Sequence, residues 1–387
     1  MALLDRLRPS QTAPLPNGTA VGARWGALAR QRRTSVGVDF GAGAIKVAQI
    51  RWTRQGPRLE NYAVVPVPPG RMDEGAIKDS GTMGELLRNV LTDMGVTQTL
   101  VGTSLGGPNI LMRYINLPKV SPEEMRSAMK FEAPQHLPIP EDQLVYDFTP
   151  VPEATGVPEH QMAVFLSGTH KKLVESFLGT LNRAGLRTNA LELDCLTALR
   201  AVQWIGMVSH TTTLPMVLLD FGEMETSISI MRYGVPMLAR TIPTGLHHLR
   251  VAVSDSMHIS AGEAEMALRL KGVKPDLDLA PAVEPWLNSL MESVGRSIEF
   301  FLIQNRGATV EQVLLMGGGS LLPNLPEALT SYLQSMLTGR PEAENLRVQP
   351  VGLAGLDMNP DLLPGVNSYG PLLMGALGSA LREGSPE

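Results

Sequence analysis

The sequence predicts an α/β protein made of two domains of like fold. The chain has 387 residues, and at roughly 100–200 residues per domain this length favours two or three domains. Short apolar segments rich in β-branched residues alternate with segments whose apolar residues recur at helical spacing. One β-rich pattern occurs twice, near residue 36 and near residue 217. A pattern duplicated over this distance indicates a duplicated domain.

Composition and charge exclude several classes of protein. The net charge is −5, but residues 1–33 carry six arginines against one aspartate, so the remaining chain has a balance of −10. Such an acidic body is a poor generic binder of nucleic acid, which needs a basic face. The single cysteine excludes a disulfide framework and a cysteine-based zinc site. The chain has no apolar run of the roughly 18 residues that a spanning helix needs.

Residues 1–33 predict a flexible basic tail. Residues 9–33 mix proline and glycine with no sustained period. Charged residues at positions 5, 6 and 8 interrupt the apolar start, so it is unlike a secretory signal and we expect a cytoplasmic protein. The alternative for the leucines at positions 3, 4 and 7 is one amphipathic turn that contacts a membrane or a partner.

Order is expected to begin at residue 35. The patterns predict strands 35–41, 44–52 and 59–67, a helix 82–94, strands 100–105 and 110–115, a helix from Ser121, strands 145–148 and 161–168, and helices 170–184 and 194–204. Ser121 is the expected N-cap, because Pro122 and two glutamates follow in the first turn. That helix is expected to stop before Pro134, whose ring is disfavoured inside a helix.

The duplicated pattern is a strand that ends in Asp-Phe-Gly. Residues 36–41 (VGVDFG) recur 181 residues later as residues 217–222 (VLLDFG). Each copy continues into a tight turn, a second strand (45–50 and 227–231), a turn with arginine and glycine, and a third strand (59–67 and 235–242). Three matched strands favour two β-meanders over a chance tripeptide. The kinase interpretation of Asp-Phe-Gly is rejected, because no Gly-rich loop, lysine strand or His-Arg-Asp loop accompanies it.

The two hairpins together predict a phosphate site with magnesium. Asp39 and Asp220 end their strands, and Gly41, Gly43 and Gly222 follow where the backbone must turn sharply and approach a ligand. Two such turns facing each other would hold a polyphosphate from both sides. The two aspartates would meet a hydrated Mg²⁺ that offsets the phosphate charge.

Further residues are expected to contact the nucleotide. Lys46 follows Asp39 by seven residues and would reach the phosphates as a point charge, and Thr226 offers a hydroxyl in the second hairpin. The apolar strand 313–316 runs into Gly317-Gly318-Gly319-Ser320, where glycines permit close approach of a base or an α-phosphate to backbone N–H groups.

These elements together resemble the actin-like ATPase superfamily, and within it the chain resembles the PilM family over about residues 35–383. The cues for that family are residues 130–140 (KFEAPQHLPIP) and 145–148 (VYDF), which resemble a small subdomain shared with FtsA. The resemblance implies two duplicated ribonuclease-H-like domains with this subdomain inserted, and it implies binding of ATP and Mg²⁺.

The resemblance also divides the chain. It implies a tail 1–33, the first part of domain I at 34–118, the inserted subdomain at 119–190 and a connecting helix at 191–212. Domain II then covers 213–387, with a small subdomain at about 245–300 and a C-terminal helix that returns to domain I.

Two departures from the family pattern affect the site. Asp220 and Asp194 are the implied catalytic residues, and Asp194 stands where filament-forming relatives have glutamate, so hydrolysis is expected to be slow. The alternative for Asp194 is a helix N-cap. Relatives place a lysine near the ribose shortly after an Ala-Glu pair; here the pair is followed by Arg269 and Lys271, and which basic residue takes that place is left open.

The implied function is an ATP-binding scaffold of the type IV pilus assembly platform. Such a protein stays cytoplasmic and reaches the inner membrane by binding the N-terminal segment of PilN, and it supports pilus biogenesis, twitching motility and DNA uptake. Other platform proteins and the pilus motor ATPases are further expected partners. Whether the chain is an enzyme is left open. The alternatives are an FtsA-like cytoskeletal protein and a small-molecule kinase of the same fold.

Overall fold

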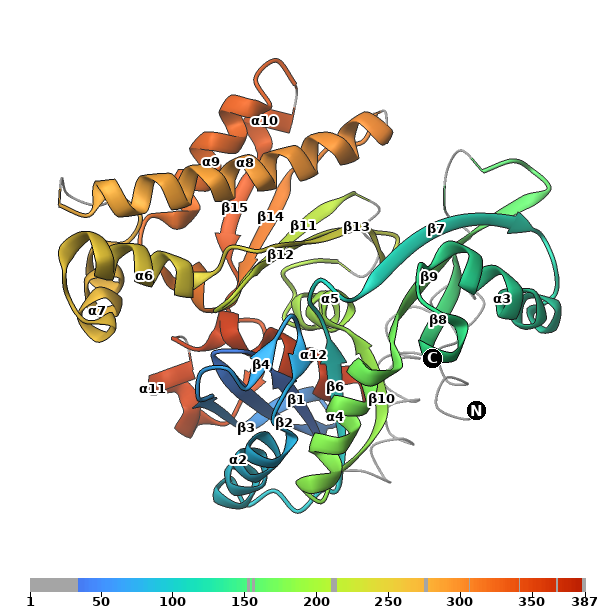
Figure 1. Cartoon of the computed structure of the whole chain (residues 1–387), viewed down its shortest axis with the longest axis horizontal. Helices are drawn as coiled ribbons and strands as arrows, with labels where there is room; N and C mark the ends of the chain where they lie inside the picture. The colour runs from blue at the N-terminus through green and yellow to red at the C-terminus, as the bar shows by residue number, and fades with distance from the viewer. Residues whose placement is uncertain are drawn as a thin grey trace.

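Two mixed β-sheets form the centre of the structure (Figure 1). This computed structural model describes residues 34–151, 154, 157–209, 214–274, 278–305, 307–340, 342–366 and 368–384, so the predicted tail lies outside the described residues. The first sheet has the order β10 (Arg187–Leu193), β6 (Leu100–Leu105), β1 (Thr34–Phe40), β2 (Ala44–Thr53), β3 (Gly56–Pro66) and β16 (Asp357–Met358). The second has the order β13 (Val235–Ile242), β12 (Thr226–Arg232), β11 (Met216–Phe221), β14 (Gln312–Met316) and β15 (Arg347–Pro350).

Both sheets are built in the same way. In the first, β1, β2 and β3 are antiparallel neighbours and β6 runs parallel to β1. In the second, β11, β12 and β13 repeat this meander and β14 runs parallel to β11. The register agrees as well, because Asp39 pairs with Lys46 and Asp220 pairs with Ser227. The structure therefore confirms the α/β fold class and the duplication.

Alternation along the strands assigns each sheet face to a layer of helices. In β11, Val217, Leu219 and Phe221 join the core of domain II, whereas Met216 and Leu218 face the opposite way. The domain II core is completed by α6 (Leu246–Met257), α7 (Ala261–Lys271), α8 (Ala280–Gln304) and α9 (Leu325–Met336). In domain I, α2 (Ser80–Asp93) and α4 (Lys171–Arg183) cover the outer face of the sheet.

Two helices fill the layer between the sheets, namely α5 (Asp194–Trp204) and α12 (Met374–Ala380) (Figure 1). Their core includes Ala48 and Ile50 of the first sheet together with Leu218 and Leu314 of the second. Glycine makes this close packing possible: a Cβ on Gly378 would lie 1.8 Å from the Thr197 carbonyl oxygen. The C-terminal helix thus packs on the domain I sheet and on α5.

The inserted subdomain is a three-stranded sheet with one helix. Its strands are β7 (Leu111–Pro118), β9 (Gln161–His170) and β8 (Leu144–Val151), in that order, and α3 (Pro122–His136) packs on them through Met125 and Met129. Because β7 pairs with β9 along its length, the subdomain begins at Leu111, not at residue 119. It ends with β9, since α4 joins the domain I core and β10 pairs with β6. The predicted bounds 119–190 are therefore corrected to 111–170.

The helix α3 also ends later than predicted. Ser121 is its N-cap in a full capping box with Glu124, as the sequence indicates. Pro134 lies inside the helix, which continues to His136. A proline this near a helix end removes one intrahelical hydrogen bond, that of its own nitrogen, and the helix still closes with the Leu137 N–H donating to the Ala133 carbonyl.

The remaining elements are short. They are β4 (Met72–Asp73), β5 (Ala76–Ile77), α10 (Glu342–Asn345), α11 (Leu363–Val366) and the 3₁₀ turns Glu141–Gln143, Gly318–Leu321, Pro360–Leu362, Gly370–Leu373 and Leu381–Gly384. Among the helices that the structure describes, none combines the length and the apolar character needed to cross a membrane.

Candidate functional site

The turns of the two Asp-Phe-Gly hairpins meet at the boundary of the two domains. Gly43, in the turn between β1 and β2, lies against Glu223, in the turn between β11 and β12: a Cβ on Gly43 would lie 3.1 Å from the Glu223 Cβ. We call this meeting point, formed by residues 39–46 and 220–227, the hairpin junction. The facing turns that the sequence predicts are thus brought together.

Lys46 is a buried cation of the hairpin junction. Its Nζ lies 3.0 Å from Oδ2 of Asp39, and the side chains of Lys46 and Asp39 are only 17% and 24% exposed. Burial lowers the pKa of Lys46, but the charges of Asp39 and Asp220 outweigh burial and leave this pKa raised. Lys46 therefore remains a cation at neutral pH, available as a point charge between two carboxylates.

Asp220 opens onto the junction at the end of β11. Desolvation by the surrounding protein raises the pKa of Asp220 to about 6, partly offset by the charge of Lys46 and reinforced by that of Asp39. The two aspartates expected to hold magnesium therefore share one lysine. The single positive charge of Lys46 cannot neutralise the negative charges of both Asp39 and Asp220.

Two more carboxyl groups crowd the same place. Burial raises the pKa of Asp194 to about 7, and the charge of Asp220 adds to the shift; burial and Asp220 likewise raise the pKa of Glu225 to about 7. Both side chains converge on the glycine turn after β6. A Cβ on Gly106 would lie 2.2 Å from Asp194 Oδ2, and one on Gly107 would lie 3.2 Å from Glu225 Oε1. Carboxyl groups of both domains therefore face one turn.

Asp194 is not a helix N-cap. Leu193 holds the N-cap position of α5, and Asp194 is the first helical residue, where its Oδ1 accepts a 2.6 Å hydrogen bond from the Cys195 N–H. The capping alternative is thereby set aside, and the side chain stays beside Gly106.

The triple glycine packs against the second hairpin. Gly317 has φ of 74°, and a Cβ there would lie 2.2 Å from Asp220 Oδ1. Gly319 is buried, and its Cβ would lie 2.6 Å from the Phe221 Cβ, whereas Gly318 is half-buried beside Leu246. The glycines let this turn reach the aspartate.

Two predicted ligands are used elsewhere. Thr226 is fully buried, and its hydroxyl donates a 2.7 Å hydrogen bond to the Thr244 carbonyl. Ser320 is 3% exposed, and its hydroxyl donates to the Gly317 carbonyl at 2.7 Å. Both hydroxyls thus tie down the backbone of a turn in this structure, and their contact with phosphate stays a prediction. The residue type alone does not predict to which side of a strand a hydroxyl points, or whether it bonds to the backbone of its own turn.

Sequence reasoning missed Glu225 and Arg250. Glu225 had a local signal, since the turn after the second Asp-Phe-Gly carries two glutamates. Arg250 on α6 had none: it ion-pairs with Glu223 and, at 3.2 Å, with Glu265, partners that are distant in sequence. Hydrogen bonding to Glu223 is the main reason that the pKa of Arg250 is raised. Arg250 thus ties the second hairpin turn to α7.

The basic residue left open near α7 remains open. Arg269 is an exposed residue that pairs with Glu265 at 2.9 Å, and Lys271, at the end of α7, is exposed too. Arg250, which also pairs with Glu265, is therefore a third basic residue bound to that helix.

The donor set suits magnesium held together with a polyphosphate. Asp39 and Asp220 lie near Lys46, and Asp194 and Glu225 both interact with Asp220, so a divalent cation would offset the excess negative charge of this group. Within the described ranges, no group of three or more histidine, cysteine or acidic side chains has a metal-binding arrangement. Phosphate and water oxygens would have to complete the coordination, which is the usual habit of Mg²⁺.

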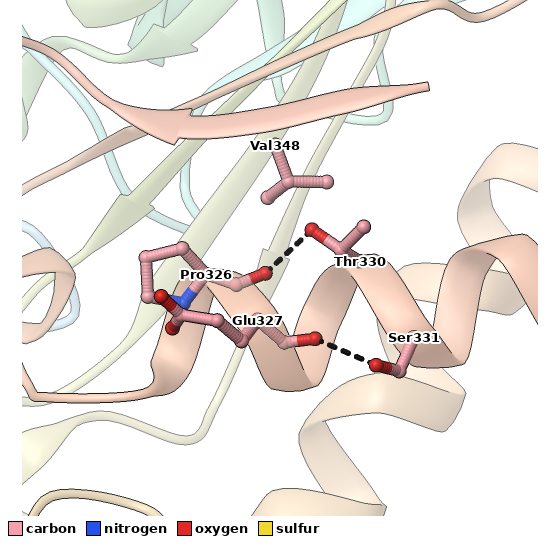
Figure 2. Close-up of a pocket in the computed structure, with 5 residues that line it drawn as sticks. All are labelled: Pro326, Glu327, Thr330, Ser331 and Val348. Atoms are coloured by element: carbon pink, nitrogen blue, oxygen red, sulfur yellow. Dashed lines mark hydrogen bonds between the residues drawn. The ribbon is translucent and has the colours of Figure 1, made fainter. Parts of the chain in front are cut away.

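A separate hollow lies at the edge of the second sheet, between α9 and β15 (Figure 2). The residues that line it are Pro326, Glu327, Thr330, Ser331 and Val348. The hydroxyls of Thr330 and Ser331 donate to the carbonyls of Pro326 and Glu327 on the same helix. Its two hydroxyls thus bond within the helix, and the hollow does not belong to the hairpin junction.

Comparisons with known proteins agree with this architecture. The family model described as "Type IV pilus assembly protein PilM" matches residues 37–339. A solved PilM–PilN type IV pilus biogenesis complex contains a chain that is 26% identical, with a TM-score of 0.78 over 91% of this chain and 99% of that one. The ethanolamine utilization protein EutJ from Carboxydothermus hydrogenoformans is 16% identical, with a TM-score of 0.53 over 98% of this chain and 94% of that one, which is a likeness of fold alone. Since the family model spans most of the sequence, the chain has the α/β actin-like ATPase fold and belongs to the PilM family of type IV pilus assembly proteins.

Proposed function

We propose that this chain is an ATP-binding scaffold of the pilus assembly platform, whose nucleotide site is the hairpin junction. The observation that carries the proposal is Lys46, a buried cation held between Asp39 and Asp220 where turns of both domains meet. A lysine in that position is compensated by the protein yet directed at the place where a polyphosphate would bridge the turns.

Each residue of the junction has a role in this proposal. Lys46 binds phosphate oxygens, and Asp39 and Asp220 hold the water ligands of magnesium. A bound Mg²⁺ would offset the phosphate charge. Gly317, Gly318 and Gly319 leave the backbone open to close approach by the nucleotide. Because nucleotide would contact both domains, binding favours their closed arrangement over an open one.

Asp194 is proposed to orient water during a slow hydrolysis. Burial and the charge of Asp220 raise its pKa to about 7, a range suited to a general base, and a cation at the junction would favour its ionised form. Asp220 would assist through the metal. The scaffold role does not depend on turnover, because a change of affinity needs only differential binding of nucleotide to two states.

The proposed partner is the N-terminal cytoplasmic segment of PilN, which would recruit this protein to the inner membrane from the cytoplasm. Support comes from the similar PilM–PilN complex, and the binding surface is proposed to lie between domain I and the inserted subdomain. Other platform proteins and the pilus motor ATPases are proposed as further partners. Pilus biogenesis would then support twitching motility and DNA uptake.

Calorimetry with Mg-ATP tests the nucleotide part of the proposal. We expect the wild-type chain to bind and the Asp220→Ala variant to lose at least roughly tenfold in affinity, because a magnesium-directed carboxylate at the junction is gone. Asp73→Ala is the matched control, since Asp73 is 64% exposed and pairs with Lys78 at 3.2 Å on the surface. No heat from the wild type, or equal affinities for wild type and Asp220→Ala, would contradict an ATP site here.

A further inference from the structure

A tyrosine of the inserted subdomain is hydrogen-bonded to domain II. Tyr114 lies on β7, and its hydroxyl donates a 3.0 Å hydrogen bond to the backbone carbonyl of Pro236 on β13. The two residues are 122 positions apart in the sequence and belong to different domains. β13 is the edge strand of the second sheet, so its outward carbonyl groups need partners from outside that sheet. Tyr114 supplies one.

The contact is set in an apolar environment. The ring of Tyr114 pairs with Phe165 on β9, with centroids 5.5 Å apart and planes tilted by 49°. Around it are buried Val151 and Ala163 of the subdomain. Leu193 of domain I and Val235 of domain II pack against the same cluster. Three parts of the molecule therefore share one small core.

Burial raises the pKa of the Tyr114 hydroxyl far above its ordinary value. The group therefore remains a hydrogen-bond donor throughout the physiological pH range. A part-buried hydrogen bond beside apolar side chains is costly to break, because its two groups regain water only in part.

The rest of the subdomain is tied to domain I. Both of its chain connections lead to that domain, and the Thr169 hydroxyl donates a 2.8 Å hydrogen bond to the Asn109 carbonyl beside them. On β8, Asp147 faces Arg382, which pairs with the buried Glu192 of the domain I sheet. Asp147 itself accepts a hydrogen bond from the Phe148 N–H. The subdomain is thus anchored on domain I, and it contacts domain II through Tyr114 and the apolar cluster around it.

We propose that Tyr114 is a positioning residue that couples closure of the two domains to the orientation of the inserted subdomain. When domain II moves relative to domain I, the edge of β13 carries Pro236 and pulls Tyr114, and with it β7. The groove between the subdomain and domain I then changes shape. Nucleotide at the hairpin junction thereby alters the affinity for the partner peptide. The inference rests on the proposed function and specifies its route.

The test measures a coupling ratio, the affinity for a synthetic PilN N-terminal peptide with saturating Mg-ATP divided by the affinity without nucleotide. The Tyr114→Phe variant keeps the ring and its packing but lacks the donor. We expect its coupling ratio to move toward one by about threefold to tenfold, because the loss of one such hydrogen bond changes an equilibrium constant by about this factor. The affinity for ATP in the absence of peptide should change by less than about twofold. By reciprocity, the effect of the peptide on ATP affinity must shrink by the same factor.

Tyr146→Phe is the matched control, because Tyr146 is a half-buried tyrosine of β8, which β9 separates from β7. Its ratio should equal that of the wild type. An unchanged ratio in Tyr114→Phe, in a chain whose wild type shows ATP binding and a ratio different from one, would overturn the inference and leave the proposed function intact. A wild type that binds no ATP would overturn the proposed function, and the inference with it. A wild type that binds both ligands with a ratio of one would overturn the coupling alone.

Discussion

Lys46 shows how much one residue can be predicted from its neighbours in a motif. Its spacing from Asp39 placed it correctly, because an antiparallel hairpin with a short turn fixes which residues pair. Thr226 was placed on the right strand but its hydroxyl bonds to Thr244. The difference is physical: a lysine beside two carboxylates stays near them for electrostatic reasons, whereas a threonine takes whichever carbonyl is nearest.

The prediction at the scale of single residues concerns Lys46. Lys46→Met keeps the unbranched apolar stem of the side chain but removes the positive charge beside Asp39 and Asp220. We expect Mg-ATP affinity to fall by roughly tenfold to a hundredfold, because a charge-assisted contact with phosphate is lost and two carboxylates are left uncompensated. Isothermal titration at pH 7.5 measures the change.

Lys78→Met serves as the control for charge in general. Lys78 is 55% exposed and pairs with Asp73 at 3.2 Å on the surface, so its loss should leave ATP affinity unchanged. Equal losses in both variants would mean that net charge, and not the position of Lys46, governs binding.

At the scale of elements, local signals succeeded where the physics is local. The capping box before α3 and the bounds of α5 follow from neighbouring residues. The start of the inserted subdomain does not, because β7 could have joined the domain I sheet and its choice of β9 is a contact over about fifty residues. The short edge strand β16 is equally non-local: it pairs with β3 some three hundred residues away.

The packing of α12 on α5 gives the element-scale prediction. A methyl group on Gly378 would lie 1.8 Å from the Thr197 carbonyl oxygen, which is rigid backbone of a helix. We expect Gly378→Ala to lower the free energy of unfolding by about 1–3 kcal/mol, because α5 and α12 must move apart to accommodate the methyl group. Urea denaturation monitored by circular dichroism measures this.

Gly179→Ala on α4 is the matched control, since nothing lies within 4 Å of a Cβ there. Alanine should stabilise that helix by roughly 0.5–1 kcal/mol, through helix propensity alone. A Gly378→Ala variant as stable as the wild type would show that the two helices are not closely packed in solution.

At the scale of the whole molecule, carboxyl groups from both domains have raised pKa values and together determine how stability depends on pH. Asp194 of α5, Asp220 of β11 and Glu225 of the second hairpin turn all have raised pKa values, about 7, 6 and 7. Asp147 of the inserted subdomain is raised to about 6 as well, chiefly by burial. The groups come from three parts of the fold, so their titration reports on how those parts are held together.

The sign of the resulting pH dependence is fixed. A carboxyl group whose pKa is higher in the folded chain than in the unfolded chain binds more protons when folded, between roughly pH 4 and pH 7. Stability must then fall as pH rises through that window. The carboxyl groups with lowered pKa values, Asp79, Glu124 and Glu263, act in the opposite direction but only below about pH 4, where they become protonated.

We therefore expect the midpoint of thermal unfolding to fall between about pH 5 and pH 7, and to level off above that range, in a metal-free buffer of constant ionic strength. The Asp194→Asn variant should show a shallower fall, because asparagine keeps the hydrogen bond from the Cys195 N–H but cannot ionise beside Asp220. Asp73→Asn, at an exposed site, should keep the slope of the wild type. Saturating Mg-ATP should flatten the wild-type curve, since cation and nucleotide favour the ionised junction. A midpoint that is level or rises over this range would show that these carboxyl groups are not crowded together in the folded chain.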